Sequence, residues 1–281
     1  MLYEMSNIKR NRPIVRRRSE QKKYFLGVCA IFHSEQSFIK EWIDFHLKQG
    51  VERFYLYDNE INPIYTQILE PYINRDQVVY CKWPDDPKQP DWTQRKAYGH
   101  CLNNYGKECE WIGFFDIDEF LFPERTLTNA GSVVELLRHF DDRVSQIMVV
   151  RYNYGNYWHD APPPVGGVVQ NYLTRDRTFS DVKSLVRTDR VKLNRVPESV
   201  HKYNSIISYG VSLNGEYSPL PLRINHYLTK STKEFNDRNT LWRKKRETRL
   251  FNPPDMRRFD KTLQPEAFNQ VYDNSAASIM L

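Results

Sequence analysis

Apolar runs alternate with amphipathic stretches along the first half of the chain. Residues 24–32 form a continuous apolar run, which is typical of a strand buried on both faces, and further strands are predicted over 51–59 and 77–83 and in the segment 111–123, where apolar residues run into three carboxylates. The stretches between them carry apolar residues at helical spacing, and they cover residues 38–50, 62–72 and 91–105. Strands that alternate with helices in this way predict right-handed βαβ units and a mainly parallel sheet.

The second half of the sequence is less regular. Its expected elements are a helix over 133–140, a strand over 145–155, a strand over 182–191 and a polar helix over 232–249. We divide the chain into a basic flexible arm (1–23), one domain (24–250) made of a nucleotide-binding half (24–123) and a smaller, mixed acceptor half (124–250), and an irregular C-terminal tail (251–281) with a weak helix near Glu266.

The net charge of +6 is unevenly distributed. Residues 1–23 hold eight Lys and Arg against two Glu, and residues 223–258 hold eleven basic against four acidic residues. Such segments could contact anionic lipid, nucleic acid or a phosphorylated substrate. No apolar run approaches the ~20 residues of a membrane span, and no secretion signal is visible. We therefore expect a cytoplasmic protein whose basic arm could touch the inner face of a membrane.

Polar side chains follow three of the predicted strands. Residues 33–35 end the first strand, Asp58 ends the second, and Asp116 and Asp118 interrupt the run at 111–123. In open α/β sheets, ligands bind outside the carboxyl ends of the strands, so one ligand could contact all three ends.

Asp116 and Asp118 are two residues apart, so in an extended chain their carboxylates project from the same face. Paired carboxylates suit Mn²⁺ or Mg²⁺ that is also bound by a substrate diphosphate and water. The alternative is a strand end with solvated acids, because a D-x-D triplet is common. The flanking Phe115 and Phe120 would hold the acids at a dry, fixed edge, which favours the metal site.

Several segments together resemble glycosyltransferase family 92 over residues 24–240, and bacterial glycosyltransferase-2-like proteins over the first half. The segments are EWIDFHLKQGVERFYLYDN, KWP, QRKAYGHCL, WIGFFDIDEFLFP, VHKY and INHYLTKS. The resemblance implies a GT-A type nucleotide-binding α/β sandwich. It also implies inverting transfer of galactose from UDP-galactose to a glycan.

The resemblance assigns roles to five of the site residues. Asp116 and Asp118 would hold Mn²⁺ against the donor diphosphate. His226 would be a late metal ligand or phosphate contact, although a lone histidine is often a core or turn residue. Lys230 and Ser231 could meet the same phosphates.

Four further residues are expected to contact the donor. Glu35 and Asp58 would face the nucleoside, with helix or turn capping as the alternative. Gln94 and Arg95 match a polar helix start in the family, with a solvated helix face as the alternative.

The catalytic base is not identified by the resemblance. Gln170 stands where family members commonly carry an acidic residue. The carboxylate candidates are Asp160, Asp181, Glu216 and Glu234, with Asp160 first because its loop is rich in aromatic residues and proline. Further sugar or acceptor contacts are expected from Lys183, His201 and Tyr203.

The sequence thus predicts a metal-dependent inverting hexosyltransferase of polysaccharide biosynthesis that acts on a glycan or lipid-linked glycan. One alternative is a nucleotidyltransferase acting on a sugar phosphate, but the FHSEQ segment after the first strand lacks the glycine-rich loop expected there. Another is a non-catalytic module that binds glycans or anions. Nucleic acid is not an expected partner, because the body of the chain is acidic and carries no nucleic-acid-binding motif.

Overall fold

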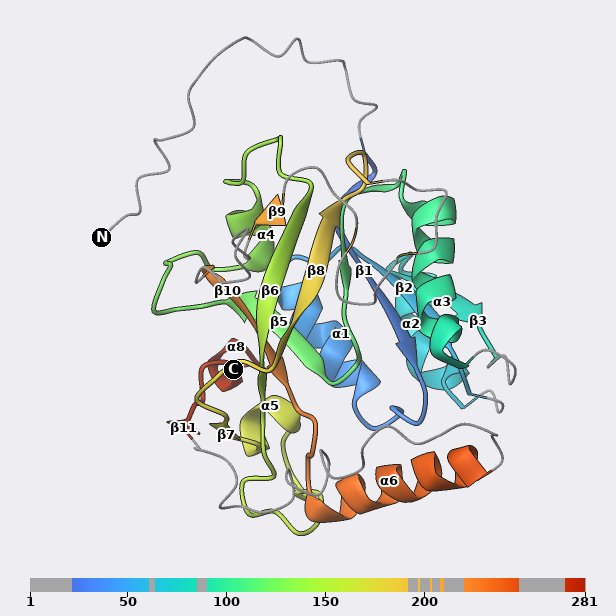
Figure 1. The fold of residues 1–281 in the computed structure, drawn as a ribbon, viewed down its shortest axis with the longest axis vertical. Coiled ribbons are helices and arrows are strands. Elements are labelled where there is room, and N and C mark those ends of the chain that lie inside the picture. Colours follow the sequence, from blue (N-terminus) through green and yellow to red (C-terminus); the bar gives the residue numbers. More distant parts are fainter. Residues whose placement is uncertain are drawn as a thin grey trace.

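The structure is a computed structural model with one large sheet flanked by helices (Figure 1). It describes residues 22–60, 64–84, 90–191, 197, 203, 208–209, 220–247 and 271–280. The strands are β1 (Tyr24–Phe32), β2 (Arg53–Asp58), β3 (Val78–Lys82), β4 (Cys109–Phe114), β5 (Glu119–Pro123), β6 (Gln146–Asn153), β7 (Thr174–Arg175), β8 (Asp181–Arg187), β9 (Ser208–Tyr209), β10 (Leu222–His226) and β11 (Val271–Tyr272). The helices are α1 (Ile39–Lys48), α2 (Thr66–Asn74), α3 (Pro90–Tyr105), α4 (Val133–Leu137), α5 (Val168–Asn171), α6 (Thr232–Glu247) and α8 (Ala277–Met280).

The sheet has a parallel half and a mixed half. Its strand order is β3-β2-β1-β4-β8-β6-β10-β5, with β9 paired to β6. Strands β3, β2, β1 and β4 are mutually parallel. Strand β8 runs antiparallel to both β4 and β6, and β10 is parallel to β6 but antiparallel to β5. The predicted α/β class, with a mainly parallel sheet and a mixed acceptor side, is confirmed.

The parallel half is apolar on both faces because helices cover both. Trp42 and Phe45 of α1 lie in one core cluster with Val28 of β1. Tyr98 of α3 lies in a second cluster with Cys29, the neighbouring residue of β1. Alternate residues of β1 therefore face different helices, which explains why its sequence is a continuous apolar run.

The segment between β4 and β5 is a turn, and this corrects the extended chain predicted for Asp116 and Asp118. Strand β4 ends at Phe114, residues 117–118 form a turn, and the Glu119 amide donates to the Asp116 carbonyl at 3.0 Å. Strand β5 then pairs with β10 at the far edge of the sheet. The two aspartates consequently lie where the chain crosses from the middle of the sheet to its edge.

The last described residues also differ from the sequence expectation, because residues 271–280 are not irregular. Strand β11 pairs with β7, and α8 packs near α1 and α5. The Asp273 carboxylate binds Arg175 and Arg223, each at 2.7 Å. The rest of the predicted tail, with Glu266, and residues 1–21 of the arm lie outside the described residues. Within the described ranges, no helix is long and apolar enough to cross a membrane.

Candidate active site

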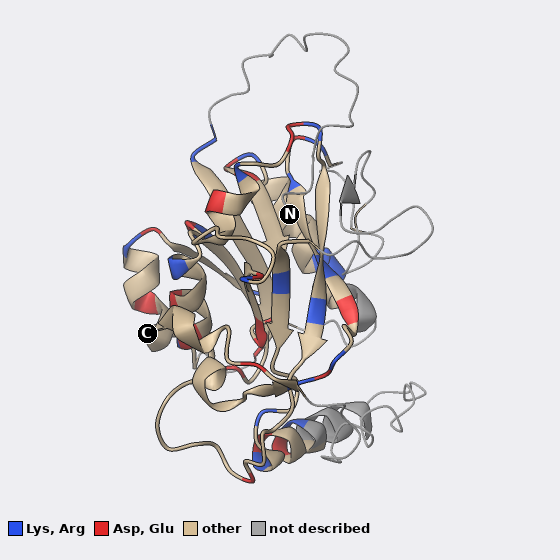
Figure 2. Ribbon diagram, turned by 90° about the vertical axis from the view of Figure 1, so that its left-hand side faces the viewer, with Lys and Arg blue, Asp and Glu red and all other residues tan. Residues whose placement is uncertain are grey.

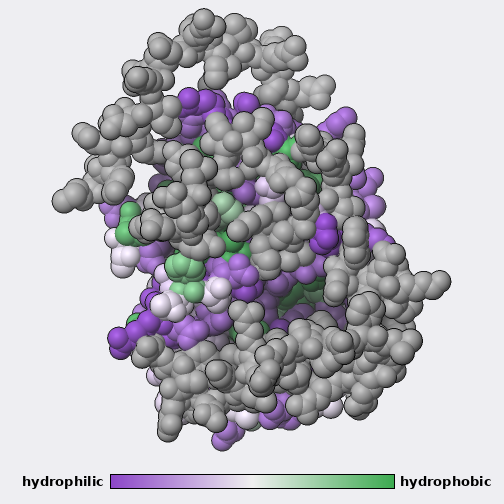
Figure 3. Space-filling view, viewed as in Figure 1, coloured by the Kyte–Doolittle hydropathy of each residue, from purple (hydrophilic) through white to green (hydrophobic). Residues whose placement is uncertain are grey.

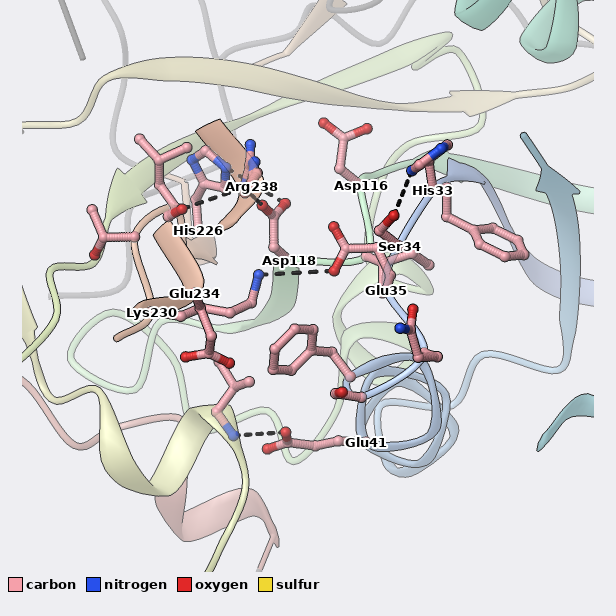
Figure 4. Close-up of a pocket in the computed structure, with 18 of the residues that line it drawn as sticks. His33, Ser34, Glu35, Glu41, Asp116, Asp118, His226, Lys230, Glu234 and Arg238 are labelled. Atoms are coloured by element: carbon pink, nitrogen blue, oxygen red, sulfur yellow. Dashed lines mark hydrogen bonds and ion pairs between the residues drawn. The ribbon is translucent and has the colours of Figure 1, made fainter. Parts of the chain in front are cut away.

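A pocket of about 1140 Å³ opens at the carboxyl ends of the central strands. Its walls come from the loop after β1, the β4–β5 turn, the end of β10, the start of α6 and the loop before α5. The lining residues used below are Glu35, Glu41, Gln94, Asp116, Asp118, Pro162, Pro163, Lys183, His226, Lys230, Glu234 and Arg238. The pocket thus brings together eight of the sixteen site residues predicted from sequence, several of which are drawn in Figure 4.

Asp116 lies against a buried layer of charge within the sheet. The Lys183 ammonium of β8 is 2.7 Å from Asp116 Oδ2 and 3.1 Å from Glu119 Oε2. Arg151 of β6 pairs with the other oxygen of Glu119 at 2.7 Å, and Gln94 donates to Asp116 Oδ1 at 2.9 Å. Figure 2 shows basic positions on strands inside the sheet as well as on loops.

This charge layer fixes the ionisation of its members. Burial disfavours the charged form of Asp116, but the neighbouring Lys183 ammonium outweighs burial and holds the pKa of Asp116 below its usual value. Burial likewise opposes the charged form of Lys183, yet Asp116 and Glu119 raise its pKa. From the sequence, Lys183 was expected to contact the sugar or the acceptor. Its side chain is 1% exposed, and its ammonium pairs with two carboxylates.

Asp118 has different partners, and Figure 4 shows it apart from Asp116 and beside His226 and Arg238. The His226 Nε2 atom is 3.5 Å from Asp118 Oδ1, and Arg238 Nη1 is 3.1 Å from Oδ2. Burial disfavours the Asp118 carboxylate, but His226 and the surrounding cations outweigh it, so the pKa of Asp118 lies well below its usual value.

The hydrogen bond on the far side of His226 orients the ring. Its Nδ1 atom is 2.8 Å from Asn153 Oδ1, so Nδ1 carries the proton and donates it. In the neutral ring, Nε2 would therefore present a lone pair to the Asp118 carboxylate. Two acceptors that face each other need a cation between them, either a proton or a metal ion.

Glu35 and Lys230 approach each other from opposite walls of the pocket (Figure 4). Their charged atoms are 3.8 Å apart, and the Lys230 ammonium also lies 4.3 Å from the centre of the Phe38 ring. Burial raises the pKa of Glu35, and the opposing effect of Lys230 does not offset it. Lys230 has a φ of 52°, so its backbone adopts a conformation that non-glycine residues rarely use.

Asp58 and Arg95 are turned toward partners other than the pocket. Asp58 is fully buried, and its carboxylate binds Lys82 at 2.8 Å and the Tyr80 hydroxyl. Arg95 donates to the Pro197 carbonyl at 2.6 Å. Neither residue lines the pocket, and their predicted donor contacts stay predictions.

The candidate bases occupy different environments. Asp160 is exposed and lies in the loop that leads to Pro162 at the pocket wall. Glu234 lines the pocket but accepts bonds from the Ser231 amide and hydroxyl and from the Tyr172 hydroxyl, at 2.9, 2.5 and 2.9 Å. With Ser231 it forms a capping box at the start of α6.

The remaining predicted contacts lie away from the pocket or outside the described part of the chain. Asp181 does not line the pocket, and Tyr203 is buried in the core, stacked on Phe114. Glu216 and His201 lie outside the described residues.

Glu41 is a pocket residue that sequence analysis missed. Its carboxylate accepts from the amides of Val168 and Val169, at 2.7 and 3.1 Å, and so satisfies the start of α5. Burial raises its pKa despite these bonds. In the sequence Glu41 is one acidic position of an amphipathic helix, and nothing there indicates a partner 127 residues away.

The donor atoms at the pocket floor suit a divalent cation only in part. Among the described residues, no group of three or more His, Cys, Asp or Glu side chains is arranged to hold a metal ion. Asp118 and His226 offer one carboxylate and one imidazole, while Asp116 is engaged by Lys183. Metal sites that also use substrate phosphates commonly need only one or two protein carboxylates. The residues therefore fit an ion that the protein and a diphosphate hold together.

A pocket outside the carboxyl ends of the strands is where open α/β sheets bind their ligands, so the fold and the pocket place this chain among the ligand-binding α/β proteins. The sequence model of glycosyltransferase family 92 matches residues 22–267. The chain therefore belongs to glycosyltransferase family 92.

Curated relatives agree with this assignment. A family 92 protein of Ricinus communis is 28% identical over 182 residues, which are 62% of this chain and 30% of the relative. One of Oryza sativa subsp. japonica is 27% identical over 224 residues, covering 78% and 35%. A galactan beta-1,4-galactosyltransferase of Arabidopsis thaliana is 23% identical over 181 residues, covering 63% and 34%. The chain thus spans about a third of the length of these relatives.

Among solved structures, S. aureus TarS (residues 1–349) aligns with a TM-score of 0.37 and 17% sequence identity, covering 58% of this chain and 47% of that one. This likeness is too low to add to the assignment.

Proposed function

We propose that this protein transfers a hexose from a nucleoside diphosphate sugar to a hydroxyl of a glycan or lipid-linked glycan, with inversion at the anomeric carbon. UDP-galactose is the proposed donor, and Mn²⁺ or Mg²⁺ the proposed metal. Family membership and the relatives named as galactan galactosyltransferases support the reaction class and the sugar.

The observation that carries the proposal is the Asp118–His226 pair at the pocket floor. Asp118 and His226 would hold the metal, which when bound would neutralise the charge that develops on the departing diphosphate. Lys230 and Arg238 lie beside this pair and would bind phosphate oxygens. Asn153 keeps the proton of His226 on Nδ1, so that Nε2 remains available as a ligand.

The proposed step is a direct displacement. The acceptor oxygen forms a bond to the anomeric carbon while the bond from that carbon to the phosphate oxygen breaks, and the nucleoside diphosphate leaves. A carboxylate takes the proton of the acceptor hydroxyl. Asp160 remains the first candidate, because its side chain is exposed and its carboxylate has no hydrogen bond or ion pair with a described residue. Glu234 is the second, because it would first have to release its capping bonds.

The test is metal-dependent release of UDP from UDP-hexoses in the presence of a glycan acceptor. Asp118→Asn should lower turnover by a factor of about 100 or more, since it removes charge at the metal. Asp141→Asn is the matched control, because Asp141 is a surface residue paired with Arg143. Equal turnover by Asp118→Asn would contradict the proposal, and release of pyrophosphate would point to a nucleotidyltransferase instead.

Membrane association through residues 1–23 is a separate part of the proposal, suited to a lipid-linked acceptor. Co-sedimentation with anionic vesicles should be lost when these residues are deleted. Sedimentation unaffected by the deletion would remove this idea.

A further inference from the structure

The loop between β6 and α5 carries two aromatic residues whose backbone lies in a rarely used conformation. Tyr157 and Trp158 are consecutive, and both have positive φ, at 46° and 66°. Neither residue type enters this region without strain. The Trp158 side chain is nevertheless 66% exposed, so burial of its indole does not offset the strain.

Hydrogen bonds hold this strained loop against the two helices that begin at the pocket. The Trp158 amide donates to Asn156 Oδ1 at 3.2 Å, and Asn156 Nδ2 donates to Thr232 Oγ1 at 3.1 Å. The Thr232 amide in turn donates to the His159 carbonyl at 2.9 Å, at the start of α6. On the other side, His159 Nε2 is 3.2 Å from the carbonyl of Asn171 in α5.

We infer that Trp158 is a stacking platform for a sugar ring of the acceptor, at the rim of the pocket. This inference rests on the proposed function. A strained backbone persists where the surrounding structure over-determines it, and such positions cluster at ligand-binding sites. An exposed indole on a backbone that is held in place offers a flat apolar face to the C–H groups of a pyranose, and a tryptophan side chain has only two rotatable bonds to order.

The position of Trp158 relative to the pocket favours an acceptor over a donor contact. Trp158 itself does not line the pocket, but Pro162 and Pro163, a few residues further along the same loop, do. Asp160, the first candidate for the base, lies between Trp158 and these prolines. A sugar stacked on the indole would therefore lie outside the donor pocket, on the loop that also carries Asp160.

The surroundings of Trp158 fit a glycan better than a membrane or a protein partner. The Tyr157 ring lies 6.2 Å from that of Tyr272, which is 57% exposed, so the aromatic surface continues onto β11. In the view of Figure 3, the parts of the described surface that are visible are mostly hydrophilic, with small and separate apolar areas. Protein and membrane interfaces require a wider continuous apolar area, whereas sugar sites combine aromatic faces with polar groups.

The experiment measures binding of defined tetrasaccharides to the full chain by calorimetry, without donor. The probes are β-1,4-linked galactotetraose, chosen from the names of the relatives, and cello-, manno- and xylotetraose. Trp158→Ala should weaken binding of the best probe at least tenfold, and Trp158→Phe should restore part of it. Leu127→Ala is the matched control, because Leu127 is a 52% exposed apolar residue in the turn after β5 and does not line the pocket. It should leave the glycan affinity unchanged.

A second measurement separates this inference from the proposed reaction. In UDP-release assays, Trp158→Ala should raise the KM for acceptor at least fivefold, with the Kd for UDP unchanged. Unchanged glycan affinity or acceptor KM would overturn the inference, as would a wild-type chain that binds none of the probes. A change in oligomeric state or vesicle binding without a change in glycan binding would also overturn it. Trp158-dependent glycan binding without UDP release would instead contradict the proposed reaction and leave the platform standing.

Discussion

The two aspartates at the pocket floor, Asp116 and Asp118, have their negative charges balanced by different kinds of partner. Asp116 pairs with Lys183, which lies on strand β8 and whose side chain is 1% exposed. Asp118 is paired instead with His226 and with Arg238, whose side chain is 35% exposed and extends from a helix. The Lys183 ammonium is shared between two carboxylates, Asp116 and Glu119, whereas His226 and Arg238 each approach a separate oxygen of the one Asp118 carboxylate. We therefore expect Asp116 to organise the site and Asp118 to bind the metal ion.

The largest expected effect is on the stability of the fold, from a substitution beside Asp116. Lys183→Met leaves Asp116 and Glu119 facing each other without their shared ammonium, and loss of one partner of a buried ion pair typically costs about 3–5 kcal/mol. Urea denaturation should register this loss in the free energy of unfolding. Lys233→Met is the control, because Lys233 pairs with Asp237 on the exposed face of α6. It should leave the free energy of unfolding unchanged. A Lys183→Met chain as stable as the wild type would break the comparison.

The second expected effect is on metal affinity, from a substitution beside His226 and Asp118. Asn153→Leu removes the acceptor that fixes the tautomer of His226, and loss of such a partner typically costs a factor of 10–100 in metal affinity. Mn²⁺ titration in the presence of UDP measures it.

The control for this variant is Asn104→Leu, because Asn104 bonds to a helix carbonyl on an exposed surface. Equal Mn²⁺ affinity in Asn153→Leu and the wild type would mean that His226 is not a ligand.

The smallest expected effect is a pH dependence that differs between Glu35 and Asp118. Burial raises the pKa of Glu35, so the folded chain binds more protons at Glu35 than the unfolded chain does. Glu35 thus makes the folded state less stable as pH rises above about 4.3, the value for an unperturbed Glu. The pKa of Asp118 is lowered, so its contribution has the opposite sign and is lost as pH falls below about 3.9.

The unfolding free energies of the wild type, Glu35→Gln and Asp118→Asn between pH 3 and 8 check these signs. The wild type should lose stability relative to Glu35→Gln as pH rises from 4 to 7. A difference that is constant with pH would contradict the raised pKa.

The sequence was sufficient to predict the parallel half of the fold. Strand β1 is a continuous apolar run and β2 and β4 are mostly apolar, because helices cover both faces, and that pattern is local. It was also sufficient to place the loop after β1 and the β4–β5 turn at one edge, since parallel strands align their carboxyl ends.

The charge layer was not predictable, because its partners are distant in sequence. Glu119 directly follows the two aspartates in the sequence, but its carboxylate is fully buried between Arg151 and Lys183, which lie 32 and 64 residues further on. The same reason explains the error at the C-terminus. The C-terminal segment is attached by ion pairs of Asp273 with Arg175 and Arg223. The residue pattern of a ten-residue segment does not predict such contacts.

The central claim is that Asp118 and His226 hold a divalent ion together with a nucleoside diphosphate, and calorimetry of UDP binding with and without Mn²⁺ tests it most directly. The account predicts that Mn²⁺ raises UDP affinity at least tenfold in the wild type and has little effect in Asp118→Ala or His226→Ala. UDP affinity that is independent of Mn²⁺ in the wild type, or an Mn²⁺ effect that survives both substitutions, would contradict it.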